Sequence, residues 1–285
     1  SMLTRGTTFR SANQIAEELE AIGASISTAC GNNTWYWNAS MLREDFEKGM
    51  EIFADVVTNP SFPQDELETM RKRVLAAIAA QDASWSSQAL RFFRKKYFPE
   101  TSPYHLQIIG EADPVSRFTA DDLKKHYSQK VLTGRRVLAI YGDIEVEKAR
   151  RIANKLLGGG PKTDTSPRTR PASPEFEPAA QPTIEVARVE VQQTQQPLAG
   201  VVIGFNTGSL IAEPDTEIIS LADTVTSGWG YPTGYLHETL RGEGLVYVVQ
   251  AQNWPGKTTN SPGTFLVYAG CEPSRVNEVV DKILL

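Results

Sequence analysis

The residues best suited to chemistry in this sequence are few and far apart. The chain has three histidines, His105, His126 and His237, and no two of them lie within two helical turns of each other. A zinc ion that activates water needs about three protein ligands in close geometry. The nearest approach is the run His237-Glu238-Thr239-Leu240-Arg241, in which arginine, a cation, takes the place of a second ligand. The sequence therefore predicts no zinc site in this chain, and no structural zinc site either.

A second group of interest is the run from Leu240 to Tyr247, LRGEGLVY, which joins a predicted helix end to a predicted strand. Arg241 and Tyr247 could both point into one cavity, where they would donate hydrogen bonds to a peptide carbonyl or a developing oxyanion. The alternative is a helix-capping arginine followed by an ordinary strand aromatic. The pattern alone leaves both interpretations open.

Three further motifs have simpler structural interpretations. The glycine-rich run 227–234 follows a predicted helix rather than a strand, which favours a helix–helix connection over a phosphate cradle. Asp65, Glu66 and Glu68 lie in a first helical turn, where they favour the helix dipole. The run Trp35-Tyr36-Trp37 places two tryptophans on one face of a strand, either for core packing or as a surface for a peptide or partner subunit.

Composition narrows the class of protein. A net charge of −5 over 285 residues, with no Lys/Arg-rich run, does not suggest a nucleic-acid partner. The longest apolar runs have the length of strands, well short of the roughly 20 residues that cross a membrane. Cys30 and Cys271 belong to no CxxC or Cys/His cluster, so we expect two separate thiols. Their pairing would require the fold to bring them together.

Hydrophobic periodicity and end signals predict an alternation of helices and strands. Helices are expected where apolar residues recur every three or four positions, over residues 11–23, 44–58, 63–78, around 90–97, from Thr119, and over 146–157, 216–225, 232–241 and from Ser274. Strands are expected over 24–29, 34–41, 136–141, 183–191, 198–205, 245–252 and 264–269. The segment from Gly158 to Pro182 contains six prolines, which is typical of an extended linker, although a long surface loop is the alternative.

The order of these elements repeats. Helix, strand, strand, helix at residues 11–58 recurs at residues 232–285. We therefore expect an α+β fold of duplicated domains, each a mostly antiparallel sheet packed with helices: 1–160 as the first domain, 161–182 as the linker and 183–285 as the second. The first copy lacks elements before the shared unit and the second lacks elements after it. Both are expected to be truncated, which would leave an unpaired sheet edge.

Five stretches identify a family by their order and spacing. They are MLTRGTTFRSANQIAEELEAIGASIS, EDFEKGMEIFADVVTNPSFPQDELETMRKRVLAAI, SPYHLQIIG, FTADDLKKHYSQKVLTGRRVLAIYGDI and LHETLRGEGLVYVVQA. Across almost its full length the chain thus resembles the pitrilysin/insulinase family of zinc metallopeptidases. That family includes mitochondrial processing peptidase and the core proteins of the respiratory cytochrome complex.

The resemblance also shows what is missing. Active members carry an inverted motif, His-x-x-Glu-His, and a third glutamate ligand that ends a run like E-R-x-x-V-x-x-E. Ser1 occupies the position of the motif's final histidine, and Ala77 stands where the ligand glutamate is expected. Met70 replaces the supporting acid. Family enzymes also use an Arg/Tyr pair from a non-zinc domain to hold substrate, which Arg241 and Tyr247 resemble with a spacing one residue shorter than usual.

The resemblance implies a non-catalytic half or subunit of a bacterial zinc-dependent metalloendopeptidase, which encloses extended peptides in a chamber. No cofactor is expected in this chain; zinc would lie in the partner, a homologous subunit forming a heterodimer or a fused N-terminal half. Arg241 and Tyr247 would complete the partner's site. The alternatives are a structural or assembly subunit like the respiratory core proteins, without catalytic role, and a module that binds peptides without cutting them. The compartment stays open, with the bacterial periplasm or cell envelope slightly favoured.

Overall fold

The protein is described by a computed structural model covering residues 2–32, 34–134, 136–158, 188–207, 216–228, 232–256 and 263–285. These residues form two compact units, one within Ser1–Ile78 and Ile108–Glu175 and the other within Ala79–Gln107 and Phe176–Leu285. The fold is α+β with antiparallel sheets in both units, as the sequence predicts. No described helix is both long enough and apolar enough to span a bilayer.

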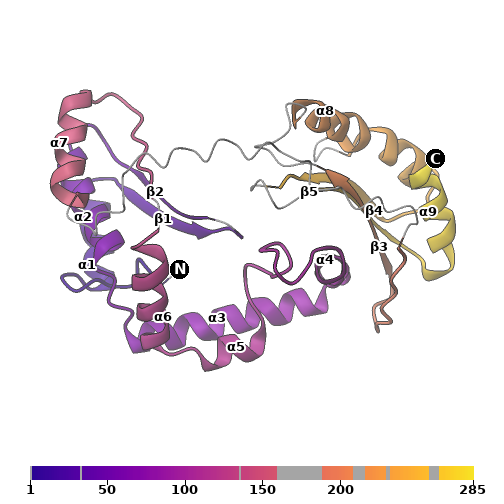
Figure 1. Ribbon diagram of the computed structural model, residues 1–285, viewed down its shortest axis with the longest axis horizontal. Coiled ribbons are helices and arrows are strands. Elements are labelled where there is room, and N and C mark those ends of the chain that lie inside the picture. The colour runs from indigo at the N-terminus through magenta and orange to yellow at the C-terminus, as the bar shows by residue number, and fades with distance from the viewer. Residues whose placement is uncertain are drawn as a thin grey trace. The chain divides into compact units, whose positions relative to one another are not determined.

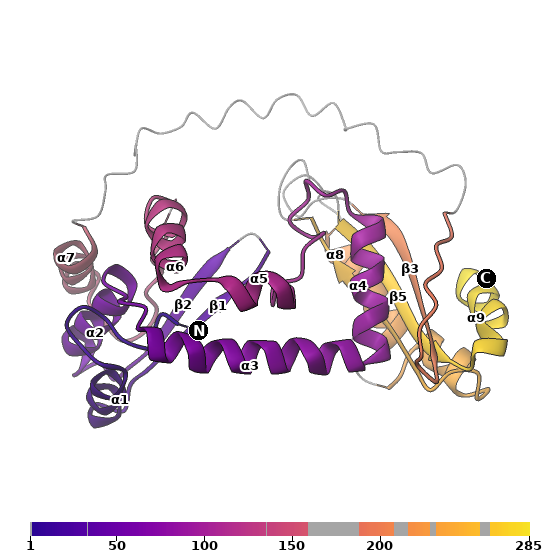
Figure 2. The ribbon, with the colours of Figure 1, turned by 90° about the horizontal axis from the view of Figure 1, so that it is seen from below.

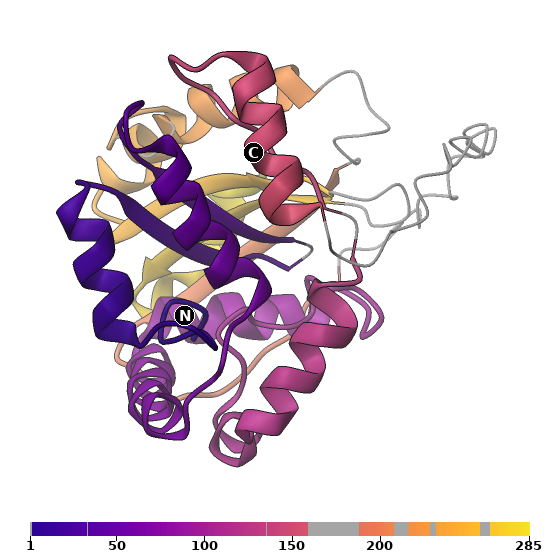
Figure 3. The same ribbon diagram turned by 90° about the vertical axis from the view of Figure 1, so that its left-hand side faces the viewer.

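The first unit is a hairpin covered by helices. Strands β1 (Ser25–Cys30) and β2 (Trp35–Ser40) pair antiparallel, and α1 (Ala12–Ala21), α2 (Phe46–Thr58) and α7 (Val146–Leu157) pack on one face (Figures 1 and 3). The strand residues that point to these helices are Ile26, Trp37 and Ala39, at alternate positions of each strand. Helices α3 (Gln64–Ala83), α5 (Ala112–Arg117), α6 (Ala120–His126) and the π-helical turn η1 (Tyr127–Val131) follow.

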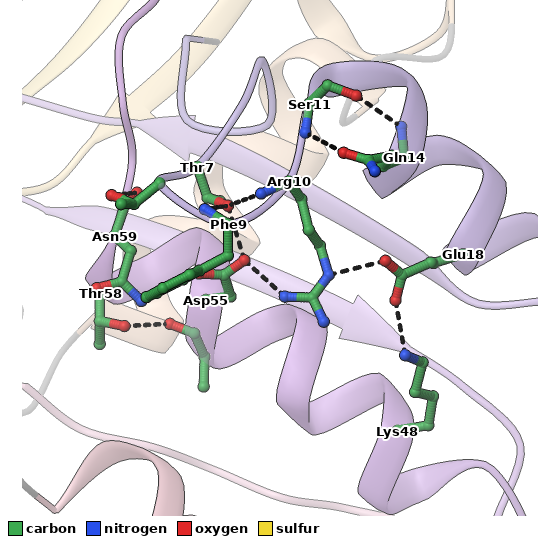
Figure 4. A network of polar contacts seen from close by, with 12 residues as sticks. Thr7, Phe9, Arg10, Ser11, Gln14, Glu18, Lys48, Asp55, Thr58 and Asn59 are labelled. Carbon is green, nitrogen blue, oxygen red and sulfur yellow. Dashed lines mark hydrogen bonds and ion pairs between the residues drawn. The ribbon is translucent and has the colours of Figure 1, made fainter.

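A polar network ties the first loop of this unit to α2 (Figure 4). Asp55, 6% exposed, accepts hydrogen bonds from Thr7 Oγ1 at 2.7 Å and from Arg10 Nη1 at 2.7 Å. Arg10 Nε also donates to Glu18 Oε1 at 2.9 Å, and Lys48 Nζ reaches the other oxygen of Glu18 at 2.6 Å. A buried carboxylate with this many donors is satisfied rather than reactive, so the network fixes the loop that precedes α1.

The second unit is a three-stranded antiparallel sheet with helices on both faces. Its strand order is β3 (Ala199–Thr207), β5 (Gly263–Cys271), β4 (Val248–Trp254). The π-helical turn η3 (His237–Arg241) and α9 (Val276–Leu284), which follows the 3₁₀ turn η4 (Pro273–Arg275), pack on one face through a shared core. Helix α8 (Thr216–Ser227) lies against β4, and α4 (Trp85–Tyr97) covers the opposite face of the sheet (Figures 1 and 2).

Two glycines allow α4 to approach its sheet closely. A Cβ added to Gly200 would lie 2.7 Å from Ala89 Cβ, and one added to Gly270 would lie 2.5 Å from the Trp85 ring. Such distances are well below ordinary carbon–carbon contact, so a larger residue would push the helix away. Residues 79–107 therefore belong to the second compact unit. The sequence predicted a first domain of residues 1–160 that would include them. The predicted linker 161–182 lies outside the described residues, and that boundary stays a prediction.

Helix α8 buries polar residues and exposes apolar ones. Asp223 and Ser227 are buried toward β4, where Ser227 Oγ donates to Asp223 Oδ1 at 2.9 Å. Ile218, Leu221 and Val225 are each 64% exposed on the other side of the helix. The sequence predicted the helix correctly, but its apolar stripe does not face the sheet.

Most local predictions are confirmed, including the repeat of a helix, an antiparallel hairpin and a helix. The capping boxes at Ser11 and Thr119 both form. The predicted strand Arg136–Tyr141 is wrong: no described residue pairs with it, and Val137 and Tyr141 are exposed. A short apolar run forms a strand only where a neighbouring strand accepts and donates the backbone hydrogen bonds. Of the predicted strand 183–191, residues 188–191 are not in a strand and the rest lie outside the described residues.

Candidate functional site

The residues of interest flank a tight loop between η3 and β4. Gly242 N–H closes the π-helical turn on His237 O at 2.9 Å, and Gly244 N–H donates to Arg241 O at 2.9 Å. Leu245 N–H then donates to Leu240 O, also at 2.9 Å. Gly244 has a φ of +69°, a conformation that glycine adopts without steric cost. Three backbone N–H groups of the loop are therefore satisfied by hydrogen bonds to the turn that precedes it.

Buried residues within the loop force the two functional candidates outward. Leu240 is fully buried, and Leu245 and Val246 are 4% and 6% exposed in the core cluster under η3 and α9. This packing explains why β4 begins at Val248 rather than at the predicted Leu245. Tyr247 N–H donates to Gly270 O at 2.8 Å, which anchors its backbone to β5, while its side chain is 75% exposed.

Arg241 and Tyr247 are both exposed, and their polar groups are unused within the described residues. There the Arg241 guanidinium and the Tyr247 hydroxyl have no hydrogen-bond partner, and no contact joins the two side chains. By contrast, two tyrosines that are more buried than Tyr247 use their hydroxyls: Tyr127 donates to Val57 O at 2.6 Å and Tyr268 donates to Gln250 Oε1 at 2.7 Å. The structure thus places the predicted pair at the two ends of one loop and does not assemble it into a closed pocket.

His237 borders a shallow depression beside Arg241. Its lining residues are Pro232, Thr233, His237, Glu238 and Arg241. Burial lowers the pKa of His237, and the positive charge of Arg241 lowers it further. The ring nitrogen Nδ1 is buried and has no hydrogen-bond partner among the described groups. The neutral imidazole is therefore favoured, next to a cation that would repel a metal ion.

The residues that the structure describes do not fit a zinc ion. Ala77 is exposed on α3 and has no donor atom, and Met70 on the same helix cannot supply a carboxylate. His105 Nδ1 lies 2.9 Å from Phe98 O, and the His126 ring lies 6.1 Å from that of Trp35. Across the described ranges no group of three His, Cys, Asp or Glu residues could hold a metal. Both cysteines are free thiols.

Arg71, inside the run that ends at Ala77, has a structural role that the sequence did not predict. Its guanidinium donates to the carbonyls of Val115 and Phe118 at the end of α5, the latter at 2.6 Å, and to Glu68 Oε2 at 3.1 Å. A cation on the last carbonyls of a helix satisfies groups that lack partners within it and interacts favourably with its dipole. This arginine thus joins α3 to α5.

Two contacts to the site loop were also missed. Arg275 and Lys282, at the start and near the end of α9, reach Gly244 and Glu243. Their partners lie 31 and 39 residues away in sequence, so no local pattern could have indicated them.

Comparison with known protein families gives two matches that together cover nearly the whole chain. A family model described as insulinase (peptidase family M16) matches residues 1–110. A second, described as the peptidase M16 inactive domain, matches residues 117–284 and so includes the loop with Arg241 and Tyr247.

Individual relatives are distant in sequence. The chain is 24% identical over 281 residues to an uncharacterised zinc protease of Streptomyces coelicolor, covering 98% of this chain and 59% of that protein. It is 26% identical over 159 residues to human cytochrome b-c1 complex subunit 1, covering 55% of this chain and 33% of that protein. The chain thus matches less than two thirds of the length of these relatives.

A solved structure shares the fold. The peptidase M16 inactive domain from Pseudomonas fluorescens aligns with a TM-score of 0.77 and 19% sequence identity, covering 99% of this chain and 65% of that one.

Proposed function

The chain belongs to the insulinase family of metallopeptidases, peptidase family M16, and from this premise we propose that it completes the active site of a zinc-bearing homologous partner. The residues of this chain supply neither a second histidine near His237 nor the third glutamate ligand, which is Ala77 here, and the model that matches residues 117–284 is described as the inactive domain. Arg241 and Tyr247 would hold an extended peptide and donate hydrogen bonds to its reacting carbonyl. The partner, a separate subunit or a fused half, would supply the zinc.

The proposal depends on one observation: the Arg241 guanidinium and the Tyr247 hydroxyl make no hydrogen bond within the described residues, although the loop that bears them is held in place. A guanidinium and a phenol that bond to nothing in the described chain contribute little to its stability. They are nevertheless held by a buried backbone on both sides, Leu240 before and Leu245 and Val246 after. Donors placed in advance on a rigid frame are what stabilisation of a developing oxyanion requires, because no reorganisation is then needed during the reaction. The depression beside Arg241 is shallow and open, which agrees with a site that a partner must complete.

The proposal is tested by mixing. The chain alone should cleave no fluorogenic peptide and should contain zinc far below one equivalent by elemental analysis. Added to the zinc-bearing M16 homologue of the same organism, it should raise turnover. Tyr247→Phe removes one oxyanion donor and should lower the assisted turnover about 10²-fold, the effect typical of losing such a donor.

The matched control is Tyr235→Phe, which alters another exposed tyrosine, 52% accessible, on the same unit. It should leave assisted turnover within twofold of the unchanged protein. An equal rate for Tyr247→Phe and the unchanged chain would remove the catalytic role of Tyr247, and stoichiometric zinc in the chain alone would contradict the non-catalytic assignment.

A structural role without chemistry is the second candidate, favoured by the likeness to cytochrome b-c1 complex subunit 1. It makes the opposite prediction. A partner that is fully active without this chain, and a chain whose Arg241 and Tyr247 variants all behave alike, would support it. The periplasm or cell envelope stays a prediction for the compartment.

A further inference from the structure

Two cations contact the loop between Arg241 and Tyr247, one from the residue that caps α9 and one from α9 itself. Arg275 Nη1 donates to the carbonyl of Gly244 at 3.0 Å, and Lys282 Nζ pairs with the carboxylate of Glu243. Arg275 is the residue immediately before α9, at the end of the 3₁₀ turn η4, and Lys282 lies in the last turn of α9. The start and the last turn of this helical segment therefore contact two consecutive residues of the site loop, Gly244 and Glu243.

Helix α9 is also held in place by the hydrophobic core of the second unit. Val279, between the two cations in sequence, is fully buried in the core cluster that contains Leu240, Leu245 and Val246. The position of α9 is thus set by the residues that set the ends of the loop. A displacement of Arg275 or Lys282 relative to the loop would require this core to repack.

The loop needs such support at its centre. Its internal hydrogen bonds satisfy the N–H groups of Gly242, Gly244 and Leu245, but they leave the Gly244 carbonyl free for Arg275. Gly244 has no side chain and a φ of +69°, so the backbone there has more accessible conformations than at any larger residue. A charged donor on this carbonyl restricts that freedom at the point midway between the two functional side chains.

We infer that Arg275, together with Lys282, is a positioning residue that holds the loop so that Arg241 and Tyr247 keep one fixed arrangement. This inference rests on the proposed function for its catalytic consequence. Neither cation is a catalytic residue, because each acts on the loop backbone or on Glu243 and not on a substrate. Substitution of either cation should therefore change the cleavage rate only by changing the positions of Arg241 and Tyr247.

The first test needs no partner and no activity. Hydrogen exchange of the complete chain is followed in the segment 242–247, in the unchanged protein and in Arg275→Gln. Loss of the contact should accelerate exchange of these amides about tenfold, and Arg275→Lys should restore part of the protection because it keeps the charge. Arg188→Gln, which removes another surface arginine of the same unit paired with Glu190, is the control and should change nothing in this segment.

Exchange in β3 and β5 must stay unchanged in every variant, which separates a local effect from unfolding of the unit. If Arg275→Gln destabilises the whole unit, Lys282→Gln supplies the second variant, with an expected acceleration of about threefold in the same segment. Equal exchange in segment 242–247 for the unchanged chain and both variants would overturn the inference.

The second test is a double-mutant cycle on assisted peptide cleavage. Arg275→Gln should lower kcat about fivefold, with KM nearly unchanged, when Tyr247 is present. In the Tyr247→Phe background the same substitution should have no further effect, because the group that it positions is gone. A general loss of structure would instead lower the rate in both backgrounds.

The cycle also separates the two proposals. If Tyr247→Phe has no effect on turnover, the proposed function fails, and the exchange measurement alone decides whether Arg275 positions the loop. If Tyr247→Phe slows the reaction but Arg275→Gln changes neither turnover nor exchange, the proposed function stands and the positioning role of α9 is wrong.

Discussion

Removal of the Asp55 carboxylate should destabilise the first unit strongly, although no chemistry depends on it. Asp55→Ala removes the acceptor for Thr7 Oγ1, Arg10 Nη1 and Asn59 Nδ2 in one step (Figure 4). The carboxylate is almost fully buried, whereas the Arg10 side chain is 20% exposed. Burial of the acceptor is what makes the loss costly, because the remaining donors must find water or stay unpaired.

The magnitude follows from these contacts. Breaking a buried ion pair by removing one partner costs about 3–5 kcal/mol. Arg10 retains its hydrogen bond to Glu18 and some access to solvent, which lowers the expected cost to about 2–3 kcal/mol. Lys48→Ala provides the contrast: Lys48 is 46% exposed and its pair with Glu18 is a surface pair, so about 0.5 kcal/mol or less is expected.

Native-state hydrogen exchange of α1 and α2 is the appropriate assay, because a chain with two compact units need not unfold in one transition. A cost of 2–3 kcal/mol corresponds to exchange about 30- to 150-fold faster in these helices for Asp55→Ala. Lys48→Ala should change it about twofold, and β3 and β5 of the other unit should be unaffected. Equal effects of the two substitutions, or less than a fivefold effect of Asp55→Ala, would refute the claim that burial of the carboxylate decides the energy.

Three further predictions concern the site and its supports. Gly244→Ala and Gly23→Ala should each lower the free energy of unfolding by about 1 kcal/mol, because both glycines have a positive φ and an added Cβ would meet no other atom. Only Gly244→Ala should also lower the rate of assisted peptide cleavage. The lowered pKa of His237 means that the folded state binds a proton at this ring less readily than the unfolded chain does. The stability of the second unit should therefore fall as the pH drops below about 6.5. In His237→Gln, the difference between the melting temperatures at pH 5 and pH 7.5 should be smaller, because this titrating group is gone. Arg71→Ala should lower the melting temperature of the first unit, whereas Arg241→Ala should leave melting of the second unchanged; equal shifts would contradict the different roles assigned to the two arginines.

The sequence predicted elements well wherever the signal was local. The capping box at Ser11 and the hairpin of β1 and β2 depend on residues within about ten positions, and both form as expected. The segment 136–141 contains an apolar run of the length of a strand, but a strand needs a neighbouring backbone, and sequence pattern does not reveal whether one is present. Helix α8 shows the same limit: periodicity predicted the helix but not that Asp223 and Ser227 would be its buried side.

The candidate site was predictable only in part, for a related reason. Arg241 and Tyr247 were candidates from their place at a helix–strand junction, and a resemblance favoured a functional role, but Leu245 and Val246 between them were taken for the start of a strand. Their burial in the loop is a tertiary effect, since both pack in the core shared with α9. The contacts from Arg275 and Lys282 could not be predicted at all, because they join residues that are more than thirty positions apart.

The contrast between Arg71 and Arg241 bears most directly on function. Both lie in runs by which the chain resembles an active peptidase, and neither can bind zinc. Arg71 contacts Glu68, Val115 and Phe118, so its presence is explained by the stability of the first unit. Arg241 makes no hydrogen bond within the described residues, and its positive charge opposes protonation of His237 beside it. Under the proposed function, Arg241 binds a group outside the chain, and the buried core and the contacts from Arg275 and Lys282 hold the loop on which it stands.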